Sequence, residues 1–317
     1  STSRVIANKI PGAVTFDNQV ENELSSEDLK QVERTLIGFA TNPNVGAVVI
    51  IEFGKEKLSA EHIAEEVKKT GSPVAIINMM KAGGIKAAVE KGVQLADTFN
   101  KELISVKRTE VSINEIAVGI ECGGSDATSG LAANPAAGFA SDLLIEHGGT
   151  TFLSETPELI GAEHALAKNA INTEVGNEII EIVNKYEQNL KKSGMDFRGA
   201  QPSPGNIQGG LSTIEEKSLG AIYKSGTAPI QGVLQHGEKF PKKGHYLMNS
   251  PGYDIESITG MIAGGAQIII FTTGRGTPVG SPIAPVIKIC GNPKMAQIMK
   301  DNIDVNAGTI ITGENSI

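Results

Sequence analysis

Apolar and polar positions alternate in blocks along this chain, and the blocks are of two kinds. Short runs rich in Val, Ile and Ala predict buried strands. The predicted strands are residues 46–53, 74–78, 116–120, 150–153 and 286–290, with a further one inside 264–276. Longer segments with a helical spacing of apolar side chains predict helices at 59–69, 83–99, 135–147, 158–170, 173–192, 213–224 and 293–300. This alternation predicts parallel βαβ units and therefore an α/β fold.

A polar, charged connector at residues 100–114 is the best candidate for a domain boundary. It predicts a first α/β lobe at 1–108 and a second, larger α/β lobe at 109–317, which carries most of the polar loops. We expect two packed lobes with mainly parallel sheets and an active-site cleft formed by Gly-rich loops at the strand ends. No segment repeats at a fixed period, which excludes a solenoid.

Composition narrows the classes of function. The 317 residues are 40% hydrophobic and 20% charged, which is typical of a globular protein. Aromatic residues make up only 4% and Trp is absent, which argues against the stacking platforms that bind single-stranded nucleic acid. The formal net charge of −8 argues against a polyanionic partner. A small anionic substrate remains compatible, because a few donors in a pocket are enough to bind it.

Cysteine usage and hydropathy indicate the compartment. Cys122 and Cys290 are the two cysteines and lie far apart in the sequence, so we expect no disulfide framework and a reducing environment. No apolar run approaches the roughly 18 to 20 residues that a membrane span needs. The sequence therefore predicts a cytoplasmic protein without membrane or nucleic-acid partners.

The segment at residues 119–130 carries the densest chemistry in the chain. A predicted strand ends there in a turn with two carboxylates, a thiol, two glycines and two hydroxyls. These are Glu121, Cys122, Gly123, Gly124, Ser125, Asp126 and Ser129. Loops beyond the carboxyl ends of parallel strands are where ligands bind, and glycines there can present N–H groups to an anion. The alternative is an ordinary strand-to-helix turn in which Cys122 is a small buried residue and not a soft metal ligand.

Further polar loops follow predicted strands at residues 53–56 and 272–276, and two more loops of the same character lie at 154–158 and 203–206. Arg275 lies between two glycines and is a candidate to pair with a substrate carboxylate through both arms of its guanidinium. The alternative for Arg275 is a surface ion pair. Asn206 is a further polar candidate in these loops.

The segment from Glu155 to His164 places Glu158 and Glu163 close to an imidazole. Glu and His side chains serve as general acids, general bases or metal ligands, although a single His is more often structural. We expect Cys122 and this segment to line one cleft, with Cys122 and His164 close enough to share a metal ion. His236 and His245 flank a Lys-rich loop and are expected to be structural or solvated.

The ordered motifs resemble those of the altronate/galactarate dehydratase family and its relative, the large subunit of sulfolactate sulfo-lyase. No nucleophile elbow, Walker A loop, H-E-x-x-H or C-x-x-C pattern competes with this resemblance. The matching segments are residues 119–126, 133–135, 154–164, 202–206, 216–220, 250–254, 271–276 and 304–308. They occur in the same order as in the family, from about Leu29 to the end of the sequence.

The resemblance implies a lyase that removes water from a sugar acid or diacid and yields a 2-keto-3-deoxy acid. It also implies a divalent metal, iron(II) or manganese. The candidate catalytic residues are His164, Glu163, Glu155 and Asp126. The candidate substrate-binding residues are Gly123, Gly124, Ser125, Ser129, Asn206 and Arg275, and the candidate metal ligands are Cys122, His164 and Glu158. The amino-acid sequence of some motifs is closer to that of the sulfo-lyase, which releases sulfite from sulfolactate.

Two departures from the family pattern leave another alternative open. Family members usually carry a His and a Cys-Gly where this chain has residues 8–13, and a Gly-Cys-Glu where it has Gly54, Lys55 and Glu56. If those residues bind metal in the relatives, this chain is a catalytically silent relative. The resemblance further implies a small partner subunit or N-terminal domain that this chain lacks, and we expect a homo-oligomer.

Overall fold

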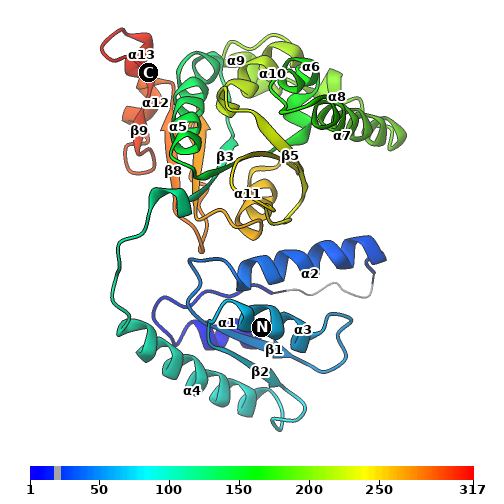
Figure 1. Ribbon diagram of the computed structural model, residues 1–317, viewed down its shortest axis with the longest axis vertical. Coiled ribbons are helices and arrows are strands. Elements are labelled where there is room, and N and C mark those ends of the chain that lie inside the picture. Colours follow the sequence, from blue (N-terminus) through cyan, green and yellow to red (C-terminus); the bar gives the residue numbers. More distant parts are fainter. Residues whose placement is uncertain (18–22) are drawn as a thin grey trace. The chain divides into compact units, whose positions relative to one another are not determined.

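The computed structural model describes residues 1–17 and 23–317, which form two compact units (Figure 1). The first unit is Ser1–Glu110 and the second is Val111–Ile317, so the division falls two residues beyond the predicted one at 108. Within the described residues no helix is long and apolar enough to cross a membrane.

The first unit is built on two parallel strands, β1 (Val48–Glu52) and β2 (Val74–Asn78). Its helices are α1 (Thr2–Ala7), α2 (Ser26–Ala40), α3 (Ala60–Lys69) and α4 (Ile85–Ile104). Ser59 caps α3, because its hydroxyl accepts from the His62 N–H at the start of the helix. The connector predicted from residue 100 is wrong at its start, since α4 continues to Ile104.

The second unit contains a seven-stranded sheet in the order β5-β6-β4-β3-β7-β8-β9, and every pair of neighbours is parallel. The strands are β3 (Ala117–Cys122), β4 (Thr150–Leu153), β5 (Ile230–Gln235), β6 (His245–Asn249), β7 (Ile268–Thr273), β8 (Val286–Cys290) and β9 (Val305–Asn306). The predicted α/β fold with parallel sheets is therefore confirmed.

Helices and short turns connect these strands. The longer ones are α5 (Asn134–Glu146), α7 (Thr173–Lys192), α10 (Ile214–Ile222) and α11 (Asp254–Ala263). The short helices are α6 (Glu163–Ala167), α8 (Phe197–Ala200), α9 (Pro204–Gln208), α12 (Pro293–Ile298) and α13 (Gly308–Ile311). The single-turn elements are η1 (Ile113–Glu115), η2 (Ser129–Ala133), η3 (Thr156–Leu159) and η4 (Tyr223–Ser225).

The helix predicted at 158–170 is wrong, because the chain forms η3 and then α6 instead. Gly161 lies between them with a φ of +92°, a left-handed conformation that ends η3 and that glycine adopts without steric cost. By contrast, the strand at 150–153 and the helix at 173–192 have the predicted bounds.

Strand β3 lies at the centre of the sheet and is buried along its whole length. Gly119 allows close packing there, since a Cβ at that position would lie 2.6 Å from Ile269 Cδ1 and 2.9 Å from Met261 Sδ. From β3 the chain first builds the β4, β6 and β5 side of the sheet and later returns to add β7 beside β3. A reversal of this kind is where open parallel sheets bind ligands, beyond the carboxyl ends of the strands. The fold therefore points to the loops that follow β3 and β7.

His245 joins three elements inside the second unit and takes no charge at neutral pH. Its Nδ1 lies 2.7 Å from Thr151 Oγ1 on β4, and its Nε2 lies 2.7 Å from Ser225 Oγ on η4. Burial lowers the pKa of His245 from 6.5 to about 4, although the charge of Asp142 acts in the opposite direction. The expectation that His245 is structural or solvated is resolved in favour of a buried structural residue.

This buried imidazole gives a first prediction, on stability against pH. Between pH 6.5 and about pH 4, His245 is protonated in the unfolded chain but remains neutral in the folded chain. The free energy of unfolding should therefore fall with acidification across this window, by roughly 3 kcal/mol from this residue. Urea titrations of the wild type and His245→Gln between pH 7 and 4 measure it. The variant should lose that part of the slope, and equal slopes would contradict the prediction.

Candidate active site

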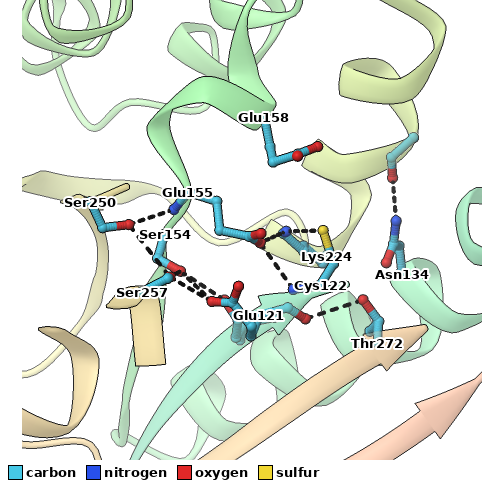
Figure 2. Close-up of polar contacts among 12 residues, drawn as sticks. Glu121, Cys122, Asn134, Ser154, Glu155, Glu158, Lys224, Ser250, Ser257 and Thr272 are labelled. Carbon is cyan, nitrogen blue, oxygen red and sulfur yellow. Dashed lines mark hydrogen bonds and ion pairs between the residues drawn. The ribbon is translucent and has the colours of Figure 1, made fainter. Parts of the chain in front are cut away.

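Two carboxyl groups, an ammonium group and a thiol lie together, all buried, at the ends of β3 and β4 (Figure 2). We call Glu121, Cys122, Glu155 and Lys224 the buried charged cluster. Lys224, which is fully buried, forms an ion pair with Glu155 and places its Nζ 2.7 Å from Cys122 Sγ. Charged groups are rarely buried without a partner, so an ion pair this deep at the strand ends indicates a functional site.

The backbone of Glu155 is strained in a way that aims its carboxylate into the cluster. Its φ is +67°, and among the described residues it is the only one other than glycine with a positive φ. The Glu155 N–H donates to Ser250 Oγ at 2.8 Å, and its carboxylate accepts from the Cys122 N–H at 2.9 Å. Strain of this kind persists where the surrounding structure holds it, and it gathers at functional sites.

Glu121 is the second buried carboxylate, and it accepts hydrogen bonds from two hydroxyls. Its Oε2 accepts from Ser257 at 2.6 Å and from Ser154 at 3.1 Å, while Oε1 has no partner among the described residues. Burial, and then the charge of Glu155, raise the pKa of Glu121 well above its ordinary value. Burial therefore favours the protonated form of Glu121, which lies beside the carboxylate that pairs with Lys224.

Lys224 and Cys122 differ in charge at neutral pH. Burial would lower the pKa of Lys224, but the facing Cys122 and Glu155 outweigh it and raise that pKa. Burial, and then the charge of Glu155, raise the pKa of Cys122. The cluster therefore holds a cationic Lys224 and a neutral thiol. A neutral thiol is a poor nucleophile and a poor metal ligand.

Asp254 reaches the same strand end from the first turn of α11. A Cβ on Gly123 would lie 2.4 Å from Asp254 Oδ2, so the missing side chain of Gly123 makes room for this carboxylate. Burial, and then the charge of Glu155, raise the pKa of Asp254 to about 6. A carboxylate with a pKa near neutrality is suited to take and return a proton.

The loops after β3 and β7 are bonded to each other. The Gly124 carbonyl accepts from the N–H groups of Arg275 at 2.9 Å and Gly274 at 3.3 Å. The Gly123 N–H donates to the Thr272 carbonyl at 3.1 Å, so it is not free to bind an anion as expected. Asp254 instead lies against Gly123, and the Arg275 backbone is bonded to Gly124, so the two residues meet neighbouring positions of one turn.

Arg275 lies over the loop that begins α9. A Cβ on Gly205 would lie 2.0 Å from Arg275 Nη1, so the absence of a side chain at Gly205 seats the guanidinium. Arg275 itself is exposed and has no ion-pair partner within residues 1–17 and 23–317. Asn206, next to Gly205, donates from Nδ2 to the Ser125 carbonyl at 2.8 Å. The predicted residues Arg275, Asn206 and Ser125 are therefore brought together, with the Arg275 side chain exposed.

Asp126 has a structural place in the turn. Its Oδ1 accepts from Thr128 Oγ1 at 2.5 Å and from the Ser129 N–H at 3.1 Å, and Ser129 Oγ accepts from the Asp126 N–H at 3.1 Å. Asn292 donates to the other oxygen at 3.3 Å. With its carboxylate occupied in this way, Asp126 shapes the loop and is not free to act as the expected catalytic group.

A pocket of about 260 Å³ adjoins this turn. Its walls come from the turn after β3, the start of α5 and the helix α10. The lining residues are Ser125, Asp126, Ala127, Ser129, Gly130, Leu131, Asn134, Leu211, Glu216, Lys217, Gly220, Ala221 and Tyr223. Its volume is close to the lower end for small-molecule sites, roughly 300 Å³, and so suits a small ligand. Lys217 on its wall donates to Glu158 Oε1 and to Gln201 Oε1, each at 3.0 Å. Glu158 is thereby tied to a lysine, and not to Cys122 or His164.

His164 and Glu163 lie apart from these groups. The side chain of His164 is 76% exposed, and its recorded neighbour is Glu163, with 3.9 Å between Nε2 and Oε1. Glu163 accepts from the Gly161 N–H at 2.6 Å and so supports a turn. In the described part of the chain no three His, Cys, Asp or Glu side chains are placed to hold a metal ion. The expected trio of Cys122, Glu158 and His164 is therefore not assembled.

Lys224 and Asp254 are the functional candidates that sequence reasoning missed. Lys224 is the last residue of the helix predicted at 213–224, where a lysine usually faces solvent, and no local signal marks its burial. Asp254 belongs to the motif at residues 250–254, which the sequence singled out without giving it a role. Its position at the first turn of a helix after a Gly was the available signal.

Comparison with known proteins adds the following. Residues 113–317 match the family described as D-galactarate/Altronate dehydratase, C-terminal, and residues 2–103 match D-galactarate dehydratase/Altronate hydrolase, second domain. Galactarate dehydratase (L-threo-forming) of Escherichia coli (strain K12) is 39% identical over 291 residues, 90% of this chain and 55% of that protein. Altronate dehydratase of Bacillus subtilis (strain 168) is 35% identical over 284 residues, 90% of this chain and 56% of that protein.

A third relative is the (2R)-sulfolactate sulfo-lyase subunit beta of Chromohalobacter salexigens. It is 34% identical over 316 residues, which are 99% of this chain and 80% of that protein. The chain thus spans about half the length of the two dehydratases and most of the length of the sulfo-lyase subunit.

Proposed function

Because this chain belongs to the D-galactarate/altronate dehydratase family, we propose that it carries the catalytic residues of a hydro-lyase. The reaction removes water from a sugar acid or diacid and yields a 2-keto-3-deoxy acid. The observation that carries this proposal is the convergence of Asp254, Arg275 and the buried charged cluster at the carboxyl end of β3. The family resemblance seen in the ordered motifs is confirmed by the comparisons.

Substrate binding depends on Arg275. Its exposed guanidinium is free of acidic partners among the described residues and can pair with a carboxylate through two parallel N–H bonds. In this proposal the neighbouring carbon of the bound substrate is placed beside Gly123, over which Asp254 Oδ2 lies. The pocket beside Ser125 then receives the rest of a short polyhydroxy chain.

Chemistry begins with the proton on the carbon next to the carboxylate. Its removal creates a dianion that water stabilises poorly, so the protein must supply positive charge that is already in place. Asp254, with a pKa of about 6, is ionised at neutral pH and takes the proton. The electron pair left behind forms a double bond to the next carbon as the carbon–oxygen bond there breaks, and the hydroxide leaves as water with the proton from Asp254. The enol that remains becomes the keto acid when its hydroxyl proton moves to carbon. The cationic Lys224 lies in a buried, low-dielectric cluster, where its charge offsets the new negative charge most strongly.

Release of sulfite from sulfolactate is the second candidate. It is supported by the match to the sulfo-lyase subunit, which covers 99% of this chain and 80% of that protein. The same base and the same arginine serve this reaction, because it also begins with loss of a proton next to a carboxylate. Sulfite is a better leaving group than hydroxide and needs less help from an acid.

The predicted iron(II) or manganese does not fit the residues as they stand. Cys122 Sγ contacts Lys224, Glu158 is paired with Lys217, and His164 is exposed. We derive no step through a metal. Elemental analysis of the purified chain tests the prediction directly, and one divalent ion per chain would show that these side chains rearrange to bind it.

A further protein partner is part of the proposal. One relative is named as a subunit beta, and the chain spans about half the length of the two dehydratases. We therefore propose that full activity uses a small subunit or an additional domain. Assays with and without such a piece, taken from a fused relative, test this.

A panel of aldonates, aldarates and sulfolactate tests the proposed function. Incubation with the chain should release a 2-keto-3-deoxy acid from one of the sugar acids, with water as the other product. Sulfite release from sulfolactate alone would select the second candidate. No turnover of any member, with the partner piece present, would favour a catalytically silent relative and contradict the proposal.

Arg275→Lys gives the prediction for substrate binding. Lysine keeps the positive charge but lacks the planar pair of N–H donors, so KM should rise about tenfold or more while kcat changes little. Steady-state kinetics on the substrate found in the panel measure it, and Arg198→Lys is a matched control on an arginine that is paired with Glu187 and Glu215. An unchanged KM in Arg275→Lys would return Arg275 to the surface-ion-pair alternative.

A further inference from the structure

The fully buried ammonium of Lys224 is carried by η4, a short turn that directly follows α10. Two sets of contacts from other elements hold it. From these contacts we infer that Asp142 and the pair Ser225–His245 are positioning residues, which place the Lys224 ammonium for the reaction. The inference rests on the proposed function, in which Lys224 offsets the charge of the reacting substrate.

Asp142 on α5 clamps the chain directly after η4. Its carboxylate accepts from the Thr227 N–H at 2.8 and 2.9 Å, from Thr227 Oγ1 at 2.8 Å and from the Ala228 N–H at 2.8 Å. Charge-assisted bonds to backbone donors are among the stronger hydrogen bonds in proteins. One carboxylate thus fixes the downstream end of the turn to α5.

Ser225, the residue after Lys224, is fixed from the sheet. Its hydroxyl is 2.7 Å from His245 Nε2, and His245 Nδ1 is 2.7 Å from Thr151 Oγ1. The hydroxyl of Ser141 on α5 donates to Thr151 Oγ1 at 3.0 Å and ends the chain of bonds. Because Ser225, His245 and Thr151 are buried and bonded to one another in sequence, these three residues hold the turn in one arrangement.

Close packing against α5 is a third restraint on η4, because it prevents the turn from moving toward the helix. A Cβ on Gly138 would lie 2.2 Å from the Tyr223 carbonyl oxygen, so the backbone of the turn rests directly on the helix. Gly226 follows with a φ of +72°, which turns the chain toward Asp142. None of these groups belongs to the buried charged cluster, and all of them act on Lys224 through the backbone.

Ser225→Ala tests the inference, with Ser141→Ala as its matched control. Both changes remove one buried hydroxyl from the same network, but only Ser225 lies in η4, the turn that carries Lys224. Ser225→Ala should lower kcat roughly 10- to 100-fold with KM little changed, because a small displacement of a catalytic charge has effects of that size. Ser141→Ala should keep kcat within about twofold. Equal kcat values per folded molecule in the two variants would overturn the inference.

A second readout does not depend on turnover. In a Cys290→Ala background Cys122 is the remaining thiol, and Lys224 lies against its sulfur. Alkylation of Cys122 by iodoacetamide should be several-fold faster in Ser225→Ala than in Ser141→Ala, since a displaced turn uncovers the sulfur. Equal alkylation rates would contradict the inference even if no substrate is found. Faster alkylation without turnover would retain the positioning role and count against the proposed function alone.

Discussion

Asp254→Asn is expected to lower kcat by about 10²- to 10⁴-fold, the range typical of a general base, with little change in the melting temperature. Asparagine fills the same space over Gly123 but accepts no proton, and loss of a carboxylate that is partly buried relieves repulsion from Glu155. Steady-state kinetics and thermal unfolding of the purified variant measure both quantities.

Glu256→Gln is the matched control for this variant. Glu256 is also an acid in the first turn of α11, but it is exposed, so its replacement removes the same charge without touching Gly123. Its kcat should stay within about twofold of the wild type. In the wild type, kcat/KM should fall as the pH drops through about 6, where Asp254 becomes protonated. A Glu256→Gln defect as large as that of Asp254→Asn would contradict the assignment of the base.

Lys224→Met is expected to lower the free energy of unfolding by about 3 to 5 kcal/mol, because it leaves the Glu155 carboxylate buried without its partner. It should also reduce kcat by about 10²- to 10³-fold, as removal of one stabilising group does in other enzymes. Urea unfolding and kinetics measure the two effects.

The double variant Glu155→Gln with Lys224→Met separates stability from catalysis. It removes both charges, so much of the lost stability should return while turnover stays low. Lys243→Met is the exposed control, since the Lys243–Glu115 pair is on the surface and should contribute about 1 kcal/mol or less. Full recovery of turnover in the double variant would contradict a catalytic role for Lys224.

In the second unit, the sequence predicted the bounds of an element best where its apolar residues follow a clear strand or helix pattern. Residues 150–153 and 173–192 have such patterns, and their bounds agree with the structure. Strands β5 and β6 were missed, because β5 mixes Gly and Gln with its apolar residues and the buried His245 begins β6. Their place at one edge of the sheet depends on tertiary pairing that the local pattern does not contain.

The candidate site was predicted in part for a related reason. Gly-rich loops after strands were expected to converge, and Ser125, Asn206 and Arg275 do lie together. Whether a polar side chain is free or already bonded depends on its three-dimensional neighbours, which is why Asp126 and Gly123 were assigned roles that their contacts exclude. Lys224 was missed because its burial is created by β3, α5 and η3, which are distant in the sequence.

Loss of the proton next to the carboxylate is the central step of this account, and a labelled substrate tests it most directly. The substrate identified in the panel would carry deuterium on that carbon, and the product of the wild-type chain would be analysed by mass spectrometry and NMR. We expect the label to pass to Asp254, so that Asp254→Asn releases it from that carbon at least 10²-fold more slowly than the wild type. Equal release by Asp254→Asn would contradict the account, whether the released deuterium is found in water or on the neighbouring carbon of the keto acid.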